Sequence, residues 1–210
     1  TQPEVAVGQA TFLKRGNTAT VMKVTGDNGS WVLKRYNIKN FWHGLKHAFR
    51  RSRAWISWQN AYRLELLGIV TPQPLAMREN RAGLFRQGAY LITEWSSGES
   101  LQAWLLRHGP AGIPDWLDRE VSRLFAIMWL GRVSHGDMKA TNLIVCGEQL
   151  QLIDLDALHR HRCKWFFKAA YGKDLQRFMD NWQGKTWQHF EQLLRPYASQ
   201  CGIKLINKKV

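Results

Sequence analysis

Alternating apolar and polar positions predict that the first part of the chain is rich in β-structure. Residues 18–25 alternate with the two-residue period of a half-buried strand. The sequence GDNG at 26–29 is a strong hairpin-turn signal, and Trp31–Lys34 reads as the returning strand. A further apolar run at 89–94 predicts another strand. We therefore expect a small sheet that includes a hairpin.

Helical spacing of apolar residues prevails in most of the remaining chain. A rough helical stripe predicts a helix from about Lys46 to Leu67, with Gly68 as its stop. Asp115 is expected to cap a helix that runs to about Leu130. The other expected elements are an extended piece from Thr71, a short helix over 101–106, short strands at 142–146 and 150–153, and interrupted helices from about Arg162. An α+β protein with a small β-rich N-terminal lobe fits this order.

The overall charge favours a polyanionic partner. The 210 residues carry 30 Lys and Arg against 16 Asp and Glu, a formal net charge of +14. Such a balance suits a phosphate-bearing substrate, a membrane surface or nucleic acid. No apolar run approaches the ~18 residues of a membrane span. The three cysteines match no disulfide or metal framework, and the eleven tryptophans are expected mostly in the core or lining a groove.

The most specific stretch is HGDMKATN at residues 135–142, placed between an amphipathic helix and a strand. Ile153-Asp154 ends a second apolar strand, and Asp154 comes twelve residues after Asn142. This combination resembles the catalytic loop of protein kinases followed by their metal-binding aspartate, with Gly136 where protein kinases usually have Arg. The resemblance implies a small lobe of about residues 1–94 and a mostly helical lobe of about 97–210. A cleft is expected between them, in one kinase-like domain spanning 1–210.

Phosphoryl transfer from ATP explains why these residue types are needed. Asp137 is expected to orient the attacking hydroxyl and accept its proton, and Lys139 to lie near the transferred phosphate. Asn142 and Asp154 supply the oxygens that would hold Mg²⁺ on the phosphates. The sequence therefore predicts an enzyme that uses ATP and Mg²⁺. His135 is expected to be a structural, hydrogen-bonded residue.

Residues upstream of this motif also resemble the nucleotide-binding residues of kinases. Lys34 ends a strand, where a kinase places the lysine that pairs with the α- and β-phosphates. Gly16 is the single glycine of a turn that corresponds to a phosphate-covering loop, which in kinases has three. Glu94 and Ser96 follow a strand as a kinase hinge does, and their backbone would bind adenine.

The partner of Lys34 stays open at this point. In kinases a helix glutamate pairs with the strand lysine, but Ser57 falls at about that position here. Glu65 or Asn60 could substitute, or the pair could be absent. The last case leaves room for a pseudokinase that binds nucleotide and acts as a scaffold.

Four stretches make the resemblance narrower: HGDMKATNLIV, LIDLDAL, GIVTPQPLA and KDLQRF. Together they resemble the bacterial lipopolysaccharide core kinases, which phosphorylate heptose or 3-deoxy-D-manno-octulosonic acid (Kdo) of the inner core. The resemblance covers about residues 12–180. It implies a cytoplasmic enzyme, peripheral on the inner membrane of a Gram-negative bacterium, with a core–lipid A glycolipid as acceptor. It also implies that Asp174 is a buried carboxylate bracing the catalytic loop.

The absence of certain sequence features indicates what kind of acceptor the enzyme would use. Residues 155–173 contain no Ser or Thr and no Ala-Pro-Glu follows, so a peptide-docking segment is missing. Basic residues interleave with aromatic ones over 34–63 and 159–168, which favours an interfacial surface that meets anionic lipid headgroups or phosphorylated sugars. No nucleic-acid motif accompanies them, so nucleic acid is not an expected partner. An antibiotic or choline-type phosphotransferase remains the alternative enzyme.

Overall fold

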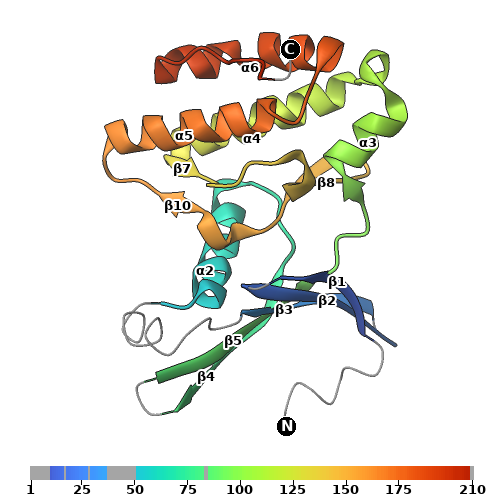
Figure 1. The fold of residues 1–210 in the computed structure, drawn as a ribbon, viewed down its shortest axis with the longest axis vertical. Coiled ribbons are helices and arrows are strands. Elements are labelled where there is room, and N and C mark those ends of the chain that lie inside the picture. Colours follow the sequence, from blue (N-terminus) through green and yellow to red (C-terminus); the bar gives the residue numbers. More distant parts are fainter. Residues whose placement is uncertain (1–9, 17, 28, 37–50, 83–84, 209–210) are drawn as a thin grey trace. The chain divides into compact units, whose positions relative to one another are not determined.

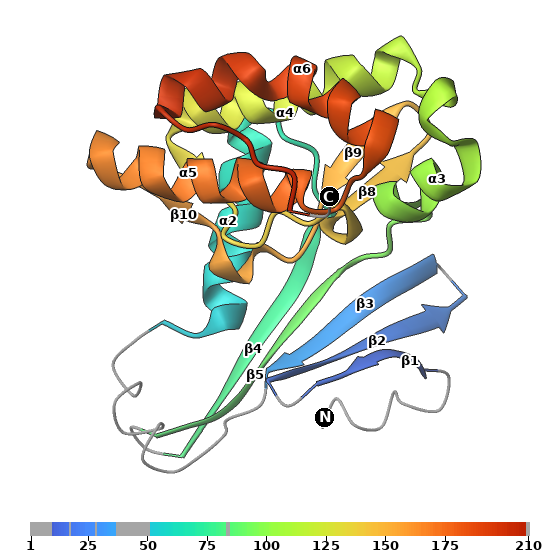
Figure 2. The same cartoon turned by 45° about the horizontal axis from the view of Figure 1, so that its top comes forward.

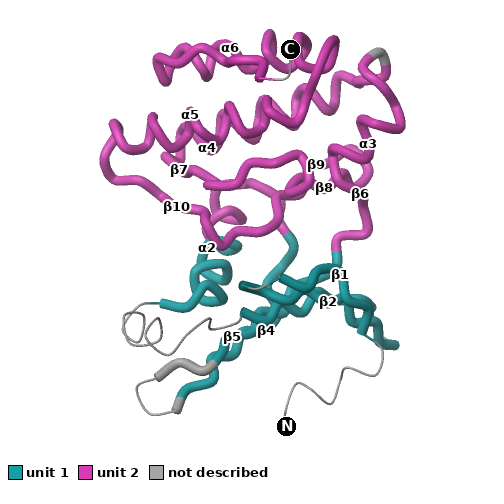
Figure 3. Tube along the Cα trace, viewed as in Figure 1, with its two compact units in different colours: residues 1–62, 72–95 teal, residues 63–71, 96–210 magenta. Residues whose placement is uncertain are grey.

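The computed structural model describes residues 10–16, 18–27, 29–36, 51–82 and 85–208. The chain divides into two compact units, which Figure 3 shows in different colours. The first unit comprises residues 1–62 and 72–95, and the second comprises 63–71 and 96–210. The chain passes from the first to the second for the last time at Trp95–Ser96.

A five-stranded antiparallel sheet forms most of the first unit (Figure 2). Its strands, in spatial order, are β1 (Ala10–Arg15), β2 (Ala19–Gly26), β3 (Gly29–Tyr36), β5 (Phe85–Glu94) and β4 (Pro74–Ala82). The predicted hairpin is confirmed, because β2 and β3 pair along their full length and close with Gly26 opposite Gly29. Gly29 has a φ of 137°, which a side chain disfavours.

Helix α2 (Arg53–Leu67) supplies the apolar partner of this sheet. Ala54 of the helix is fully buried with Tyr36, Ala89 and Leu91 of the strands, and Trp58 packs against the same cluster. Alternate residues of a strand share one face, so Ala89 and Leu91 face the helix together. The core of the first unit is therefore the layer between α2 and β3–β5.

Two small sheets and several helices form the second unit (Figure 1). One sheet joins β6 (Glu99–Ser100), β8 (Leu143–Cys146) and β9 (Gln149–Leu152), and the other joins β7 (Val133–Ser134) and β10 (His159–Arg160). The helices of this unit are α3 (Leu101–His108), α4 (Asp115–Gly131), α5 (Lys164–Met179) and α6 (Gly184–Cys201), with 3₁₀ turns η2 (Pro110–Gly112), η3 (Ala140–Asn142) and η4 (Leu155–Ala157).

Aromatic side chains fill the space where α6 packs on α4 and α5. Phe178 lies at its centre, with its ring centroid 5.5 Å from Phe125 and 5.2 Å from Phe190. Tyr171 is fully buried and donates its hydroxyl to the carbonyl of Phe125 at 2.8 Å. Such edge-on aromatic contacts stabilise a core beyond the area they bury.

The structure corrects several sequence-based boundaries. Helix α2 begins at Arg53, because the Ser52 hydroxyl accepts from the Trp55 N–H at 3.0 Å and caps the helix there. Residues 46–50, which were expected to begin this helix, lie outside the described residues. Asp115 is the first helical residue of α4 and not its cap, since Pro114 occupies the cap position. Strand β1 was not predicted, and the extended piece from Thr71 continues into a full strand, β4. The α+β, kinase-like fold class itself is confirmed.

No helix among the described residues is long and apolar enough to cross a membrane.

Candidate active site

A buried carboxylate holds the loop that follows β7 in place. Asp174 of α5 is 1% exposed and accepts hydrogen bonds from the N–H groups of His135, at 2.5 Å, and Gly136, at 2.9 Å. His135 is fully buried; its Nε2 lies 3.0 Å from the carbonyl of Ile153, and its Nδ1 accepts from the Asp137 N–H at 3.3 Å. Burial lowers the pKa of His135, so the ring is neutral at neutral pH. The structural role expected of His135 and the bracing role expected of Asp174 are both confirmed.

Gly136 shows why arginine cannot stand at this position of the loop. Its φ of 80° lies in the region that favours glycine, and a Cβ atom there would meet the carbonyl oxygen of Ala157 at 2.9 Å. The loop therefore runs against η4, and its path depends on the absence of a side chain at 136.

Asp137 is held by two cations of the same unit. Arg177 donates to its Oδ1 at 2.5 Å, and the Lys139 ammonium lies 3.1 Å from the carboxylate. Partial burial acts to raise the pKa of Asp137, but the hydrogen bond from Lys139 and the charge of Arg177 outweigh it and lower the pKa overall. Asp137 is therefore an ionised, oriented carboxylate at neutral pH.

Sequence reasoning missed Arg177. It lies three residues after Asp174 on α5, so both side chains emerge on one helix face, and Arg177 also donates to the Gly136 carbonyl at 3.2 Å. The stretch KDLQRF, already singled out for Asp174, contained this signal as an i, i+3 pair.

Asn142 and Asp154 lie at the same end of one hairpin. Strands β8 and β9 pair with Leu143 opposite Leu152, and the Ile153 N–H donates to the Asn142 carbonyl at 2.9 Å. The side-chain amide of Asn142 donates to the Asp137 carbonyl at 2.9 Å, so its side-chain oxygen is the atom that could bind a metal. An amide oxygen and a carboxylate are hard oxygen donors of the kind that Mg²⁺ prefers.

This donor set suits Mg²⁺ bound together with phosphates. The described residues contain no group of three or more His, Cys, Asp or Glu that could hold a metal by themselves. Mg²⁺ is commonly held by only one or two carboxylates, with substrate phosphates and water completing its octahedron. Asn142 and Asp154 fit that arrangement, and Asp154 has a left-handed backbone, with φ 62° and ψ 60°, at the turn into η4.

Lys34 lies on β3 in the first unit, next to an aromatic ring. Its Nζ is 5.2 Å from the ring centroid of Tyr36, two residues along the strand. The Tyr36 hydroxyl in turn lies 3.3 Å from the hydroxyl of Ser57 on α2, and both residues are buried. Asn60 is buried on the same helix, whereas Glu65 is exposed. At Ser57, the position expected for a helix glutamate, the structure thus has a hydroxyl bonded to a strand tyrosine.

The other expected nucleotide-binding residues lie in a turn and in the connection between the units. Gly16 is in the β1–β2 turn, and its own N–H donates to the Ala19 carbonyl at 3.0 Å. The N–H of Glu94 donates to the Gln73 carbonyl and that of Trp95 to Ser30. Among the hydrogen bonds of the described residues none uses the Ser96 N–H, so this donor fits the role expected of it.

Lowering the pH should reduce turnover at a higher pH than the one at which the protein unfolds. Burial raises the pKa of Asp174 to about 6, against hydrogen bonds from His135 and Gly136 that lower it. Protonation below that pH removes an acceptor from the loop, so we expect turnover to fall with a midpoint near pH 6. The pKa of Asp174 in the folded protein exceeds the ordinary value of 3.8, so the folded state binds a proton more tightly than the unfolded chain does. The resulting contribution to the free energy of unfolding is complete below pH 3.8 and is lost as the pH rises through about 6. Asp174 itself therefore does not drive acid unfolding.

The check is kcat from pH 5 to 8, with thermal denaturation followed at each pH. Asp174→Asn presents an amide to the two N–H donors, and an unsatisfied buried group costs about 1–3 kcal/mol. This variant should turn over ~10-fold or more slowly at neutral pH and lose the midpoint near pH 6. An unchanged midpoint in Asp174→Asn would assign the acid limb to another group.

Comparison with solved structures identifies a protein that shares this fold. The structure titled "WaaP in complex with acyl carrier protein" matches with a TM-score of 0.64 and 18% sequence identity, over 91% of this chain and 79% of that one. At this identity the likeness shows the fold. With the strand and helix order above, it defines the fold as kinase-like.

The family follows from the sequence itself. The chain belongs to the lipopolysaccharide kinase (Kdo/WaaP) family, whose sequence model matches residues 6–197. The resemblance inferred from the four motifs is thereby confirmed, and the family is one of lipopolysaccharide kinases. The comparison with curated proteins returned no match.

Proposed function

We propose that this protein transfers the γ-phosphate of ATP to a hydroxyl of heptose or Kdo in the inner core of lipopolysaccharide. The observation that carries the proposal is the ionised Asp137, fixed by Arg177 and Lys139 beside Asn142, in a chain of the lipopolysaccharide kinase family. In this proposal residues 1–210 act as one kinase domain, with lobes of about 1–94 and 97–210.

Each residue then has a defined task. Asp137 orients the acceptor hydroxyl and takes its proton as the oxygen bonds to the γ-phosphorus and the bond from that phosphorus to the bridging oxygen breaks, releasing ADP. Lys139 offsets the charge on the transferred phosphate. Asn142 and Asp154 would hold Mg²⁺, which when bound neutralises phosphate charge.

Nucleotide binding is assigned to Lys34, Gly16, Glu94 and Ser96. Lys34 would contact the α- and β-phosphates, and the Glu94 carbonyl and Ser96 N–H would bind adenine. The turn at Gly16 would cover the phosphates through backbone groups other than the Gly16 N–H, which is already bonded. The acceptor is proposed to be a core–lipid A glycolipid, reached from the cytoplasmic face of the inner membrane.

A pseudokinase is the second candidate, and the burial of Ser57 at the place of a helix glutamate favours it. Measuring turnover separates the candidates. Purified protein, ATP and MgCl₂ are incubated with Kdo–lipid A, heptose–Kdo–lipid A, an aminoglycoside and choline, and each product is analysed by mass spectrometry.

Gain of one phosphate on a core sugar, located by fragmentation, is the expected result. Phosphorylation of the aminoglycoside or choline alone would identify a small-molecule phosphotransferase. Nucleotide binding without turnover on any acceptor would identify the pseudokinase. Either of these outcomes overturns the proposal.

A further inference from the structure

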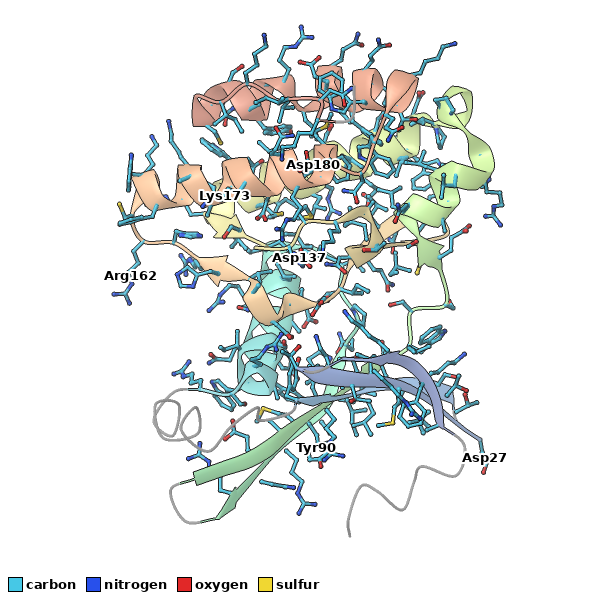
Figure 4. The ribbon with its side chains drawn as sticks, viewed as in Figure 1. Asp27, Tyr90, Asp137, Arg162, Lys173 and Asp180 are labelled. Carbon is cyan, nitrogen blue, oxygen red and sulfur yellow. The ribbon has the colours of Figure 1, made fainter. Side chains whose placement is uncertain are left out.

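An exposed basic and aromatic surface covers the start of α5 and the strand before it. We define this β10–α5 patch by six residues, which are all exposed: His159, Arg160, Arg162, Lys164, Trp165 and Phe166. The chain has no Asp or Glu from residue 157 to 173. Figure 4 shows Arg162 projecting outward ahead of α5.

The two aromatic residues of the patch are unusually exposed for their size. Trp165 is 71% exposed and Phe166 is 61% exposed, and their ring centroids are 5.0 Å apart. The aromatic residues that follow on the same helix, Phe167 and Tyr171, are 2% exposed or less. The expectation that tryptophans lie in the core or line a groove therefore does not describe Trp165, and two adjacent exposed rings indicate an interaction site.

The charge around these rings has one sign. The first turn of α5 has no acidic residue and begins with Lys164. The positive end of a helix dipole disfavours a cation at that position, so the sequence is not optimised there for the stability of the helix. Together with Arg160 and Arg162, this end of the unit is complementary to a surface of anions.

The patch is also tied to the catalytic loop. Strand β10 pairs with β7, with His159 opposite Ser134, and β7 leads directly into His135. His161 Nε2 lies 2.7 Å from the Ser134 hydroxyl, which adds a side-chain contact to the strand pair. A surface that docks through this patch is thereby held in a fixed relation to the loop that carries Asp137.

We propose that the β10–α5 patch docks the protein on an anionic phospholipid bilayer, with Trp165 and Phe166 inserted at the headgroup level and Arg160, Arg162 and Lys164 on lipid phosphates. Paired exposed rings ringed by cations are typical of interfacial membrane contacts. The proposal deepens the proposed function, because docking at this position would present a membrane-anchored acceptor to the catalytic loop.

The other basic segment is less suited to this role in its described part. Arg51 donates to Gln59 at 2.6 Å, and the Arg53 guanidinium lies 5.4 Å from the Tyr36 ring centroid. These contacts tie both arginines to the first unit, whereas among the described residues no hydrogen bond or ion pair restrains the side chains of Arg160, Arg162 and Lys164.

Vesicle binding by the whole protein tests the proposal. Partition onto vesicles of phosphatidylcholine with phosphatidylglycerol is compared with partition onto phosphatidylcholine alone. Each cation near an anionic surface contributes about fivefold to binding, so Arg160→Gln, Arg162→Gln and Lys164→Gln together should weaken it roughly 100-fold. The matched control replaces Arg119, Lys173 and Lys185 with Gln, which removes the same charge elsewhere in the second unit.

The two aromatic residues of the patch are tested by a separate double variant with its own control. Trp165→Ser with Phe166→Ser should lower partition ~10-fold or more, because two large apolar side chains lose their insertion. Leu106→Ser with Ile206→Ser removes two other exposed apolar residues of the same unit and should change partition less than about twofold.

Cys163, inside the patch, allows the contact to be seen directly. It is exposed, and the nearby backbone N–H groups of Phe166 and Trp165 lower its pKa, which favours labelling of its thiolate. With Cys146 and Cys201 changed to Ser, an environment-sensitive dye at Cys163 should shift to the blue with anionic vesicles and not with phosphatidylcholine.

The outcomes separate docking from catalysis. Vesicle binding by either patch variant at the wild-type level, or equal losses in the controls, overturns the docking proposal whatever the enzyme does. Patch-dependent binding to an acidic protein or to nucleic acid, without any to vesicles, overturns it in favour of that partner. Patch-dependent vesicle binding by a protein without turnover on any core acceptor would support docking while the proposed function fails.

Discussion

Asp137→Asn is expected to lower turnover ~10²-fold or more while leaving nucleotide affinity nearly unchanged. Removing a positioned general base typically costs this much. The asparagine has nearly the same shape, and its oxygen can still accept from Arg177, so the loop should keep its path. In the proposed mechanism, what is lost is the negative charge that orients the hydroxyl and receives its proton.

The lowered pKa of Asp137 makes this prediction more specific. A carboxylate kept ionised by Lys139 and Arg177 is a weak base, so its main task is orientation until late in the transfer, as a loose transition state requires. The loss should therefore appear in kcat, with little change in the affinity for ATP.

Asp180→Asn is the matched control, because Asp180, which is labelled with Asp137 in Figure 4, is a carboxylate of the same unit. Asp180 pairs with Lys208 at 2.8 Å. It should retain turnover within about twofold, since an exposed ion pair contributes little. Both variants are compared by steady-state kinetics, nucleotide binding and thermal denaturation. Near-normal turnover in Asp137→Asn would remove Asp137 from the mechanism.

Asp154→Asn should abolish most of the Mg²⁺-dependent turnover and raise the Mg²⁺ concentration required for the remainder. The ion supplies several kcal/mol of charge stabilisation, so a ~10²-fold loss is expected when its carboxylate ligand becomes a neutral amide. Asparagine is the informative replacement, because it tolerates the left-handed backbone at residue 154 better than alanine does. The effect then reports the lost charge and not a strained turn.

Asp156→Asn provides the comparison two residues away, in the 3₁₀ turn η4. It should cost less than ~10-fold, because the proposed function assigns the metal ligand to Asp154. Turnover at several Mg²⁺ concentrations is the measurement for both. If Asp156→Asn proves the more damaging, the metal ligand has been assigned to the wrong aspartate.

The sequence alone determined the features that depend on local spacing. The β2–β3 hairpin could be predicted because a GDNG turn fixes its own geometry, and the strands around 142–146 and 150–153 because a short apolar run flanked by polar turns has few alternatives. The motif HGDMKATN with Asp154 likewise identified the kinase-like loop, because phosphoryl transfer needs those groups in that order. The family assignment followed from the same local stretches.

Only the tertiary structure decided which distant residues meet. Arg177 contacts Asp137 across forty positions of sequence, and such a contact exists only once α5 has packed beside the loop. Ser57 and Tyr36 meet in the same way between α2 and β3, and no local pattern specifies a pair of hydroxyl groups. The edge strand β1 was missed because its described side chains are almost all exposed, so they carry little of the hydrophobic alternation that reveals a strand.

Tertiary packing also decided which aromatic rings of α5 are exposed. In the run Trp165-Phe166-Phe167 three aromatic residues are equivalent by composition, yet only Phe167 is buried. Which of them faces the core is fixed by the rotation of α5 about its own axis where it packs on α4. There the ring centroid of Phe167 lies 5.2 Å from that of Trp129. Local sequence thus determined the residue types of the loop, and long-range packing decided which side chains support it and which remain exposed on the surface.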